Sequence, residues 1–305
     1  MILVNVLVAD IGGTKIAAGF SDGSGRINCR VEVKSASHDA EAMFESLHTA
    51  FFDVLNQGKI TYEEIDVISL GVPGVVDAAN GVAVFQNNLP WRNFPLANRL
   101  RSAFPNASII MDNDVYMAAF GEWKAQMLEK ETFAYVTIST GISGCILHEG
   151  KFIRGRGLAG EVGFSVMEDK DEVQTLESLA SGPAMEAKAR RVFGDPTMTT
   201  KKLMELYEEL DPKAAIVVQQ AAKYIARGLH QLFTVLDPHV IVVGGGVINN
   251  QPQFLKLIQK ELEHLSDNPI QKGMSTRLKP SHYKGDAGLQ GALHCALEKN
   301  REYQK

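Results

Sequence analysis

The chain has 305 residues, of which 45% are hydrophobic and 22% are charged; this suits about two folded domains and excludes a disordered or fibrous protein. Its 31 lysines and arginines stand against 36 aspartates and glutamates, a formal net charge of −5 without a basic tract, which disfavours nucleic acid as a partner. The three cysteines are far apart in the sequence, and no leader pattern or long apolar run is present. We therefore expect a cytoplasmic protein that neither forms a disulfide framework nor inserts into a membrane.

Short β-rich runs separated by glycine-rich turns open the chain and predict an antiparallel meander. Beyond them, segments with apolar residues at helical spacing alternate with short buried strands. This order of elements is typical of an α/β fold. The elements predicted in the first half are strands at 2–9, 16–20, 26–33, 65–71 and 108–111 and helices at 40–55 and 114–125.

The second half repeats this order of elements, although no residue-level repeat is visible. Its predicted elements are strands at 132–139, 144–148, 151–154 and 240–243 and helices at 212–236 and 254–265. We therefore predict two α/β domains, a small one at 1–117 and a larger one at 118–287. The C-terminal helix, at about 288–305, is expected to pack back on the small domain.

The segment DIGGTK, from Asp10 to Lys15, lies at the predicted turn between the first two strands. Gly12 and Gly13 would let backbone N–H groups approach a phosphate, Thr14 can donate a hydroxyl, and Asp10 can hold a hydrated Mg²⁺. An ordinary hairpin turn would explain the glycines but not the Asp and Thr beside them. The spacing matches neither a P-loop nor GxGxxG, and the missing GxGxxG disfavours a Rossmann dehydrogenase.

Two further glycine-containing segments lie in the second half. STGISG, at 139–144, takes the same hairpin position, so Thr140 and Gly141 are expected to share one polyphosphate with the first turn. For Ser143 and Gly144, turn chemistry alone is the better interpretation. The strand at 240–243 runs into Gly244, Gly245 and Gly246, a backbone surface suited to adenine and ribose.

In this order the motifs resemble the ROK family of sugar kinases and sugar-responsive repressors, within the sugar kinase, Hsp70 and actin superfamily. The resemblance implies two actin-like, RNase H-like domains around a central cleft, and it covers nearly the whole chain. The blocks that carry it are DIGGTK at 10–15, GVPGVVD at 71–77, NNLPW at 87–91, DNDVYMAAFGEW at 112–123, STGISG at 139–144, GLAGEVGF at 157–164, LESLASG at 176–182 and LDPHVIVVGGGV at 236–247.

The resemblance also implies roles for single residues. Asp114 would be the catalytic base that accepts the proton of the attacking sugar hydroxyl. Its alternative role is a helix N-cap, which aspartate favours. The residues implied to bind or line the sugar are Gly74, Asn88, Asn113, Glu161 and Glu177, although isolated glutamates are more often solvated surface acids.

The chain departs from the family pattern in two places. Phe164 stands where most members carry a zinc-binding histidine that also contacts the sugar, and 167–175 contains no Cys or His. Without these ligands a tetrahedral zinc site cannot form, so we predict no structural zinc. Val75 stands where some amino-sugar kinases carry Arg, which disfavours an N-acetyl hexosamine.

These observations predict a kinase that transfers the γ-phosphate of Mg-ATP to a hexose, with glucose and its 6-hydroxyl expected first. Fructose, mannose, N-acetylmannosamine and a β-glucoside remain open as substrates. A non-catalytic sugar-sensing regulator and an Hsp70-like or actin-like ATPase also remain open as functions. The repressor branch carries a DNA-binding module ahead of DIGGTK, whereas this sequence reaches Asp10 almost at once. The resemblance favours a homodimer.

Overall fold

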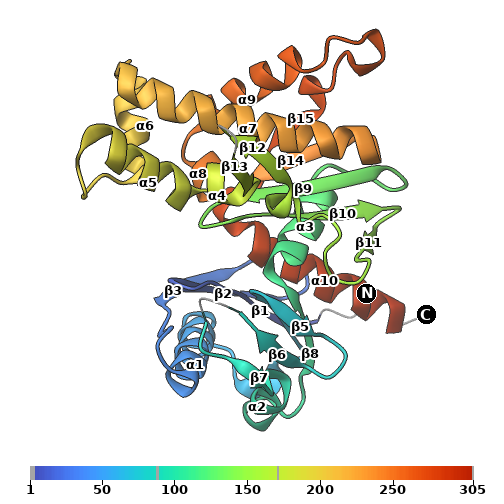
Figure 1. Ribbon diagram of the computed structural model, residues 1–305. Helices are drawn as coiled ribbons and strands as arrows, with labels where there is room; N and C mark the ends of the chain where they lie inside the picture. The colour runs from blue at the N-terminus through green and yellow to red at the C-terminus, as the bar shows by residue number, and fades with distance from the viewer. Residues whose placement is uncertain (1–3, 87–88, 170–171, 304–305) are drawn as a thin grey trace. The chain divides into compact units, whose positions relative to one another are not determined.

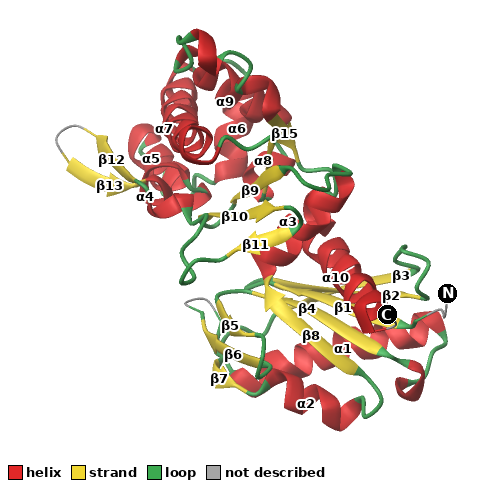
Figure 2. Ribbon diagram, turned by 90° about the vertical axis from the view of Figure 1, so that its right-hand side faces the viewer, coloured by secondary structure: helices red, strands yellow, loops and turns green. Residues whose placement is uncertain are grey.

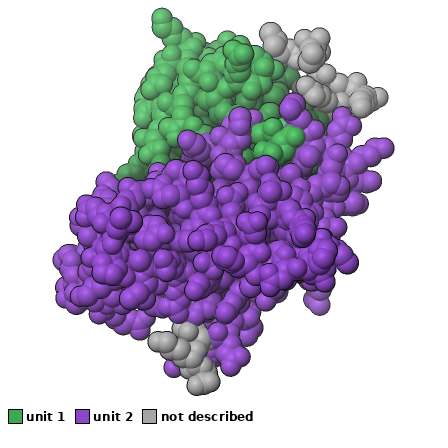
Figure 3. All heavy atoms as spheres, turned by 90° about the horizontal axis from the view of Figure 1, so that it is seen from above, with its two compact units in different colours: residues 1–126, 286–305 green, residues 127–285 purple. Residues whose placement is uncertain are grey.

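The computed structural model describes residues 4–86, 89–169 and 172–303. The chain divides into two compact units, residues 1–126 with 286–305 and residues 127–285 (Figure 3). The boundary that we predict after residue 117 falls inside helix α3 (Asp114–Ala125), all of which belongs to unit 1. Of the helices in the described ranges, none has both the length and the apolar character that crossing a bilayer requires.

Unit 1 is built on a five-stranded sheet in the order β3-β2-β1-β4-β8 (Figure 1). Strands β1, β2 and β3 form the predicted antiparallel meander, and β4 and β8 run parallel to β1. All six residues of β4 are buried, as expected for a central strand with helices on both faces. The bounds are Val6–Ile11 for β1, Lys15–Ser21 for β2, Cys29–Lys34 for β3, Val67–Val72 for β4 and Ser108–Asn113 for β8.

Successive residues of β1 enter the cores on opposite faces of this sheet. Leu7 and Ala9 join the cluster that includes helix α1 (Ala40–Gly58), whereas Val6 and Val8 join the cluster that includes α10 (Ala287–Tyr303). Figure 2 shows α1 on one face of the sheet and α10 on the other. The C-terminal helix therefore packs within unit 1.

A second, three-stranded sheet in unit 1 follows β4 directly. Its order is β5-β6-β7, and helix α2 follows β7. None of these four elements is predicted from the sequence, because each is short and only partly buried. They lie at Val75–Asp77 (β5), Val82–Phe85 (β6), Arg92–Phe94 (β7) and Leu96–Ala103 (α2), with a 3-10 turn at Tyr62–Glu64 earlier in the unit.

Unit 2 repeats the plan of unit 1, as its element order predicts. Its sheet runs β11-β10-β9-β14-β15, with an antiparallel meander followed by two strands parallel to β9. The bounds are Thr132–Ile138 for β9, Ile142–His148 for β10, Lys151–Ile153 for β11, Val240–Gly244 for β14 and Leu278–Pro280 for β15.

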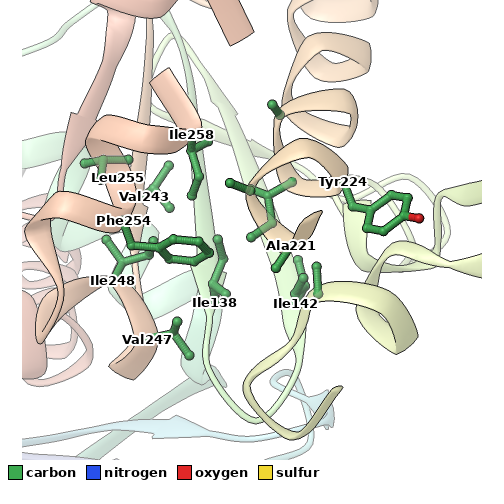
Figure 4. Packing of buried hydrophobic residues seen from close by; sticks show 14 of the residues in the cluster. Ile138, Ile142, Ala221, Tyr224, Val243, Val247, Ile248, Phe254, Leu255 and Ile258 are labelled. Carbon is green, nitrogen blue, oxygen red and sulfur yellow. The ribbon is translucent and has the colours of Figure 1, made fainter. Parts of the chain in front are cut away.

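Helices α7 and α9 cover this sheet. The α7 helix has the bounds predicted from its periodicity, because the Asp211 side chain caps it and Pro212 occupies its first position. Figure 4 shows Ile138 and Val243 of the sheet in one hydrophobic cluster with Ala221 of α7 and Phe254 of α9. The helices are α4 (Leu176–Ala180), α5 (Gly182–Phe193), α6 (Thr200–Glu208), α7 (Pro212–Leu236), α8 (Gly246–Asn249) and α9 (Pro252–His264).

The segment in which we predict no zinc ligands contains a β-hairpin. It pairs β12 (Val166–Asp169) with β13 (Glu172–Thr175) and follows the 3-10 turn Val162–Phe164. Three further short 3-10 turns lie at Pro269–Gln271, Ser275–Arg277 and Lys284–Asp286.

Candidate active site

The first phosphate-binding candidate is the turn between β1 and β2 in unit 1. The backbone N–H of Gly12 donates to the Lys15 carbonyl at 2.9 Å, and a Cβ on Gly12 would lie 2.9 Å from that oxygen. Ser35 Oγ donates to the Gly12 carbonyl at 2.6 Å, while Gly13 is partly exposed and Thr14 is exposed. The turn is therefore held by its own backbone and by Ser35, with Gly13 and Thr14 open to a ligand. Lys15 itself forms an ion pair with Glu32 at 2.8 Å.

Asp10 lies at the end of β1, beside this turn. Burial and the negative charge of Asp114 raise the pKa of Asp10 to about 7, with a smaller opposing effect from Lys15. A bound divalent cation would lower the pKa of Asp10 again. Its charge would compensate for the water that burial removes and would offset the repulsion from Asp114. Carboxylate oxygens are also the ligands that Mg²⁺ prefers. The donor set at Asp10 therefore fits a magnesium ion.

Two glycines allow the backbone to approach Asp10 closely. A Cβ on Gly288, in the first turn of α10, would lie 2.5 Å from Asp10 Oδ2. A Cβ on Gly71 of β4 would lie 3.3 Å from Asp10 Oδ1 and 3.4 Å from the Cα of Asp114. Gly71 therefore brings Asp10 and Asp114 to the same end of the sheet. The role of Gly288 was missed, because the sequence does not show which helix approaches the strand.

The start of α3 tests the N-cap interpretation of Asp114. Asn113 is the N-cap, and its Oδ1 accepts from the backbone N–H groups of Val115 at 2.9 Å and Tyr116 at 3.3 Å. Asp114 is the first helical residue, with Oδ1 3.0 Å from the backbone nitrogen of Val115. The N-cap alternative for Asp114 is therefore wrong: the cap is the preceding residue, Asn113. Both asparagine and aspartate favour this position, so the sequence alone does not distinguish them.

The amide of Asn113 also fixes the loop that was predicted to line the sugar pocket. Its Nδ2 donates to the carbonyl of Gly74 at 2.9 Å. Gly74 has φ +83°, a left-handed conformation that favours glycine, and any Cβ there would clash with Phe85 and Gln86. Asn88, also predicted to line this pocket, lies outside the described residues.

In unit 2, the turn between β9 and β10 is held by Glu177. Its Oε2 accepts from the backbone N–H of Ile142 at 2.8 Å, and a Cβ on Gly141 would lie 2.5 Å from the same oxygen. Ser139 N–H donates to the Gly141 carbonyl at 2.8 Å, and Thr140 is exposed at the tip. Glu177 thus shapes the second turn, a role that is not evident from the sequence.

Glu161 is the second acid in this part of unit 2. Burial raises its pKa, as does the charge of Glu177, while a hydrogen bond with the Ser143 side chain opposes them. Phe164, three residues further on, has 59% of its surface exposed. Among the residues described on either side of positions 170–171, no three His, Cys, Asp or Glu gather where they could hold a metal ion. The absence of structural zinc stays a prediction.

A cavity of about 680 Å³ lies within unit 2. Of the residues predicted to bind the nucleotide, Thr140 and Gly246 line this cavity, whereas Gly244 and Gly245 do not. A Cβ on Gly244 would lie 2.5 Å from the Tyr135 hydroxyl oxygen, and Gly245 packs against the backbone of Ile138 with φ +89°. These two glycines therefore shape the start of α8. The lining residues are Ser139, Thr140, Gly182, Pro183, Glu186, Thr200, Lys201, Met204, Gly246, Val247, Asn250 and Gln251.

Residues 6–299 match the profile of the family described as "ROK family". The chain belongs to the ROK family. It is 27% identical to a glucokinase of Halalkalibacterium halodurans, over 97% of this chain and 96% of that glucokinase. An N-acetylmannosamine kinase of Yersinia pseudotuberculosis is also 27% identical, over 94% of this chain and 96% of its own.

The ROK hexokinase structure from Thermus thermophilus is similar to this ROK protein throughout. It is 31% identical, with a TM-score of 0.79 over 98% of this chain and 100% of the other. The fold is therefore the actin-like ATPase fold of ROK sugar kinases, as the sequence predicts.

Proposed function

We propose that this ROK sugar kinase transfers the γ-phosphate of Mg-ATP to a hexose, with glucose as the preferred sugar and its 6-hydroxyl as the acceptor. The observation that carries the proposal is the pair formed by Asp10 and Asp114 beside Gly71 at one end of the unit 1 sheet. The Asp10 carboxylate suits a metal ion that binds the phosphate, and the Asp114 carboxylate suits the acceptance of the hydroxyl proton. The glucokinase and hexokinase among the relatives support the reaction.

Asp114 is proposed as the catalytic base. Asn113 makes the principal N-cap contacts of α3, so the helix does not depend on the Asp114 carboxylate for its cap. In phosphoryl transfer the sugar hydroxyl attacks the γ-phosphorus in line, the bond from that phosphorus to the bridging oxygen of ADP breaks, and a carboxylate takes the hydroxyl proton. General-base assistance of this kind contributes about 10²- to 10⁴-fold to the rate.

Asp10, Gly13 and Thr14 are proposed to bind the phosphate end of the donor. Asp10 would hold a hydrated Mg²⁺, which supplies neutralisation of the charge on the phosphate oxygens when bound. The exposed hydroxyl of Thr14 can donate to a phosphate oxygen, and the Thr140 hydroxyl of unit 2 can do the same. Because phosphoryl transfer depends mainly on alignment and charge neutralisation, these groups and one base suffice.

The sugar is proposed to bind through Asn113, Glu161 and Glu177. Glu177 has one oxygen committed to Ile142, which leaves the other to accept from a sugar hydroxyl. Val75 is 58% exposed beside Gly74, and its side chain offers no hydrogen bond to an N-acetyl group. This favours a plain hexose over N-acetylmannosamine, although relatives of both kinds share the same identity with this chain.

Initial rates of ADP release with Mg-ATP and a panel of hexoses test this proposal. The panel contains glucose, mannose, fructose, N-acetylmannosamine and a β-glucoside, each at saturating donor. We expect the highest kcat/KM with glucose, and identification of the product as the 6-phosphate. Absence of turnover with every sugar would refute the kinase, whereas a preference for another sugar would refute only the choice of glucose.

The remaining proposals concern the state of the protein. We propose a homodimer without structural zinc that acts in the cytoplasm and binds no nucleic acid. The net charge of −5 supports the absence of nucleic acid binding, and the lack of Cys and His at 167–175 supports the absence of structural zinc. Light scattering after gel filtration tests the homodimer, and metal analysis of the purified chain tests the absence of zinc.

A further inference from the structure

Four charged side chains of unit 1 form a continuous series of ion pairs that begins in the DIGGTK turn. Lys15 Nζ lies 2.8 Å from Glu32 Oε2, and the same oxygen lies 3.4 Å from Nη2 of Arg30. Arg30 also contacts Asp286 Oδ1, through Nε at 3.0 Å and through Nη2 at 2.8 Å. Arg30 is therefore the member of the series that joins strand β3 to the segment before α10.

Asp286 is the first residue of unit 1 after the chain returns from unit 2. The residue before it, Gly285, has open space around it, because a Cβ there would meet no atom within 4 Å. Lys284 has φ +54°, a left-handed conformation that side-chain-bearing residues adopt rarely. Helix α10 begins immediately afterwards, at Ala287. The contacts with Arg30 therefore hold the chain at the point where α10 begins.

The first turn of α10 lies against the proposed magnesium ligand. A Cβ on Gly288 would lie 2.5 Å from Asp10 Oδ2, so the backbone of the helix approaches that carboxylate closely. A small displacement of this turn would change the space in which Asp10 can orient its oxygens. Residues that orient a metal ligand without contacting the metal commonly affect metal affinity. Asp286 is two residues from Gly288, so its contacts with Arg30 bear on the geometry of Asp10.

We propose that Arg30 is a positioning residue of the magnesium site, which holds the first turn of α10 against Asp10 and so strengthens binding of the metal-bound donor. This inference rests on the proposed function. Arginine suits the role because its planar guanidinium presents several N–H donors at once, so that one side chain reaches both Glu32 and Asp286.

The exposure of the ion pair sets the size of the expected effect. The side chains of Arg30 and Asp286 are 38% and 41% exposed. Partly exposed ion pairs contribute about two- to fivefold to an equilibrium constant. The charge of Arg30 alone would act in the opposite direction, because a nearby positive charge repels Mg²⁺. Positioning therefore predicts weaker metal binding when Arg30 is lost, whereas charge repulsion alone predicts tighter binding.

Calorimetric titration of the full-length protein with ADP, once with Mg²⁺ and once with EDTA, measures the metal-dependent part of binding without catalysis. The variants are Arg30→Met, Asp286→Asn and the two combined. Arg30→Lys keeps the charge but lacks the planar set of donors. The matched control is Arg26→Met, because Arg26 is an exposed arginine shortly before β3 that lies outside this series of ion pairs.

In Arg30→Met we expect the affinity for Mg-ADP to fall about two- to fivefold, with no change in the affinity for ADP in EDTA. The double variant should bind Mg-ADP no more weakly than Asp286→Asn alone, because both substitutions remove the same contact. Arg30→Lys should recover part of the loss. Hydrogen exchange in the first two turns of α10 should become faster in Arg30→Met, whereas Arg26→Met should match the wild type in every measurement.

Unchanged or tighter binding of Mg-ADP by Arg30→Met would overturn this inference, and so would an equal loss with Mg²⁺ and with EDTA. Losses that multiply in the double variant would overturn it as well. Each of these results leaves the kinase proposal intact. If the wild type binds ADP equally well with Mg²⁺ and with EDTA, both this inference and the proposed magnesium role of Asp10 are wrong.

Discussion

Replacing Asp10 with Asn should stabilise the ligand-free protein while removing its activity. In the folded chain the pKa of Asp10 is raised from 3.8 to about 7, chiefly by burial. At 1.36 kcal/mol for each pH unit, this shift corresponds to about 4 kcal/mol of stability lost when the carboxyl ionises. Asp10 keeps partial solvent exposure, so we expect roughly half of this value as the gain on substitution.

The dependence on pH follows from the sign of the shift. The folded protein holds the Asp10 proton more tightly than the unfolded chain, so the favourable contribution is complete below the unfolded pKa of 3.8 and is lost as pH rises through about 7. Asp10→Asn carries no ionisable group there. Its advantage over the wild type should therefore be small near pH 4 and reach its full value above about pH 8.

Urea unfolding without Mg²⁺ at about pH 4.5, 6 and 8.5 measures this difference. The control is Asp267→Asn, because Asp267 is exposed in unit 2 and should give no comparable gain. Added Mg²⁺ should stabilise the wild type at the highest pH and leave Asp10→Asn unchanged. A variant that is less stable than the wild type above pH 8 would refute the electrostatic account of Asp10.

Three further substitutions separate the roles of the site residues. Asp114→Asn should lower kcat by about 10²- to 10⁴-fold with little change in the KM for sugar, measured by coupled ADP release. Gly288→Ala should raise the Mg²⁺ concentration required for half-maximal rate, whereas Gly285→Ala, where a Cβ meets no atom within 4 Å, should not. Glu161→Gln should raise the sugar KM and flatten its dependence on pH, because burial raises the pKa of Glu161 above its ordinary value and Gln does not titrate.

The main strands of both sheets and the helices α1, α3, α7 and α9 could be predicted because these buried elements carry strong periodicity. The α7 helix was located with its bounds by apolar residues at helical spacing, and the structure shows that Asp211 caps it. The small sheet β5-β6-β7 and the hairpin β12-β13 were missed because their strands have three or four residues, and few of the described ones are buried. Strands that short give no measurable alternation.

The candidate site was predictable where one segment supplies the chemistry. DIGGTK contains its own turn, so its position between β1 and β2 follows from the sequence. The cavity of unit 2 draws its lining from segments near 140, 182, 200 and 250, which only the tertiary structure assembles. Likewise, Asn113 and Asp114 are both good N-caps, and the geometry of the loop at Gly74 decides which of them caps α3.

The contact between α3 and α10 links the two carboxylates of the site. A Cβ on Gly121 of α3 would lie 2.8 Å from the backbone nitrogen of Gly291 in α10, so the two helices touch through their backbones. Asp114 lies in the first turn of α3. Gly288 lies in the first turn of α10 and contacts Asp10. Any side chain that forces the helices apart must therefore change the spacing between the proposed base and the proposed magnesium ligand. This explains why a C-terminal helix far from DIGGTK in sequence belongs to the site that DIGGTK begins.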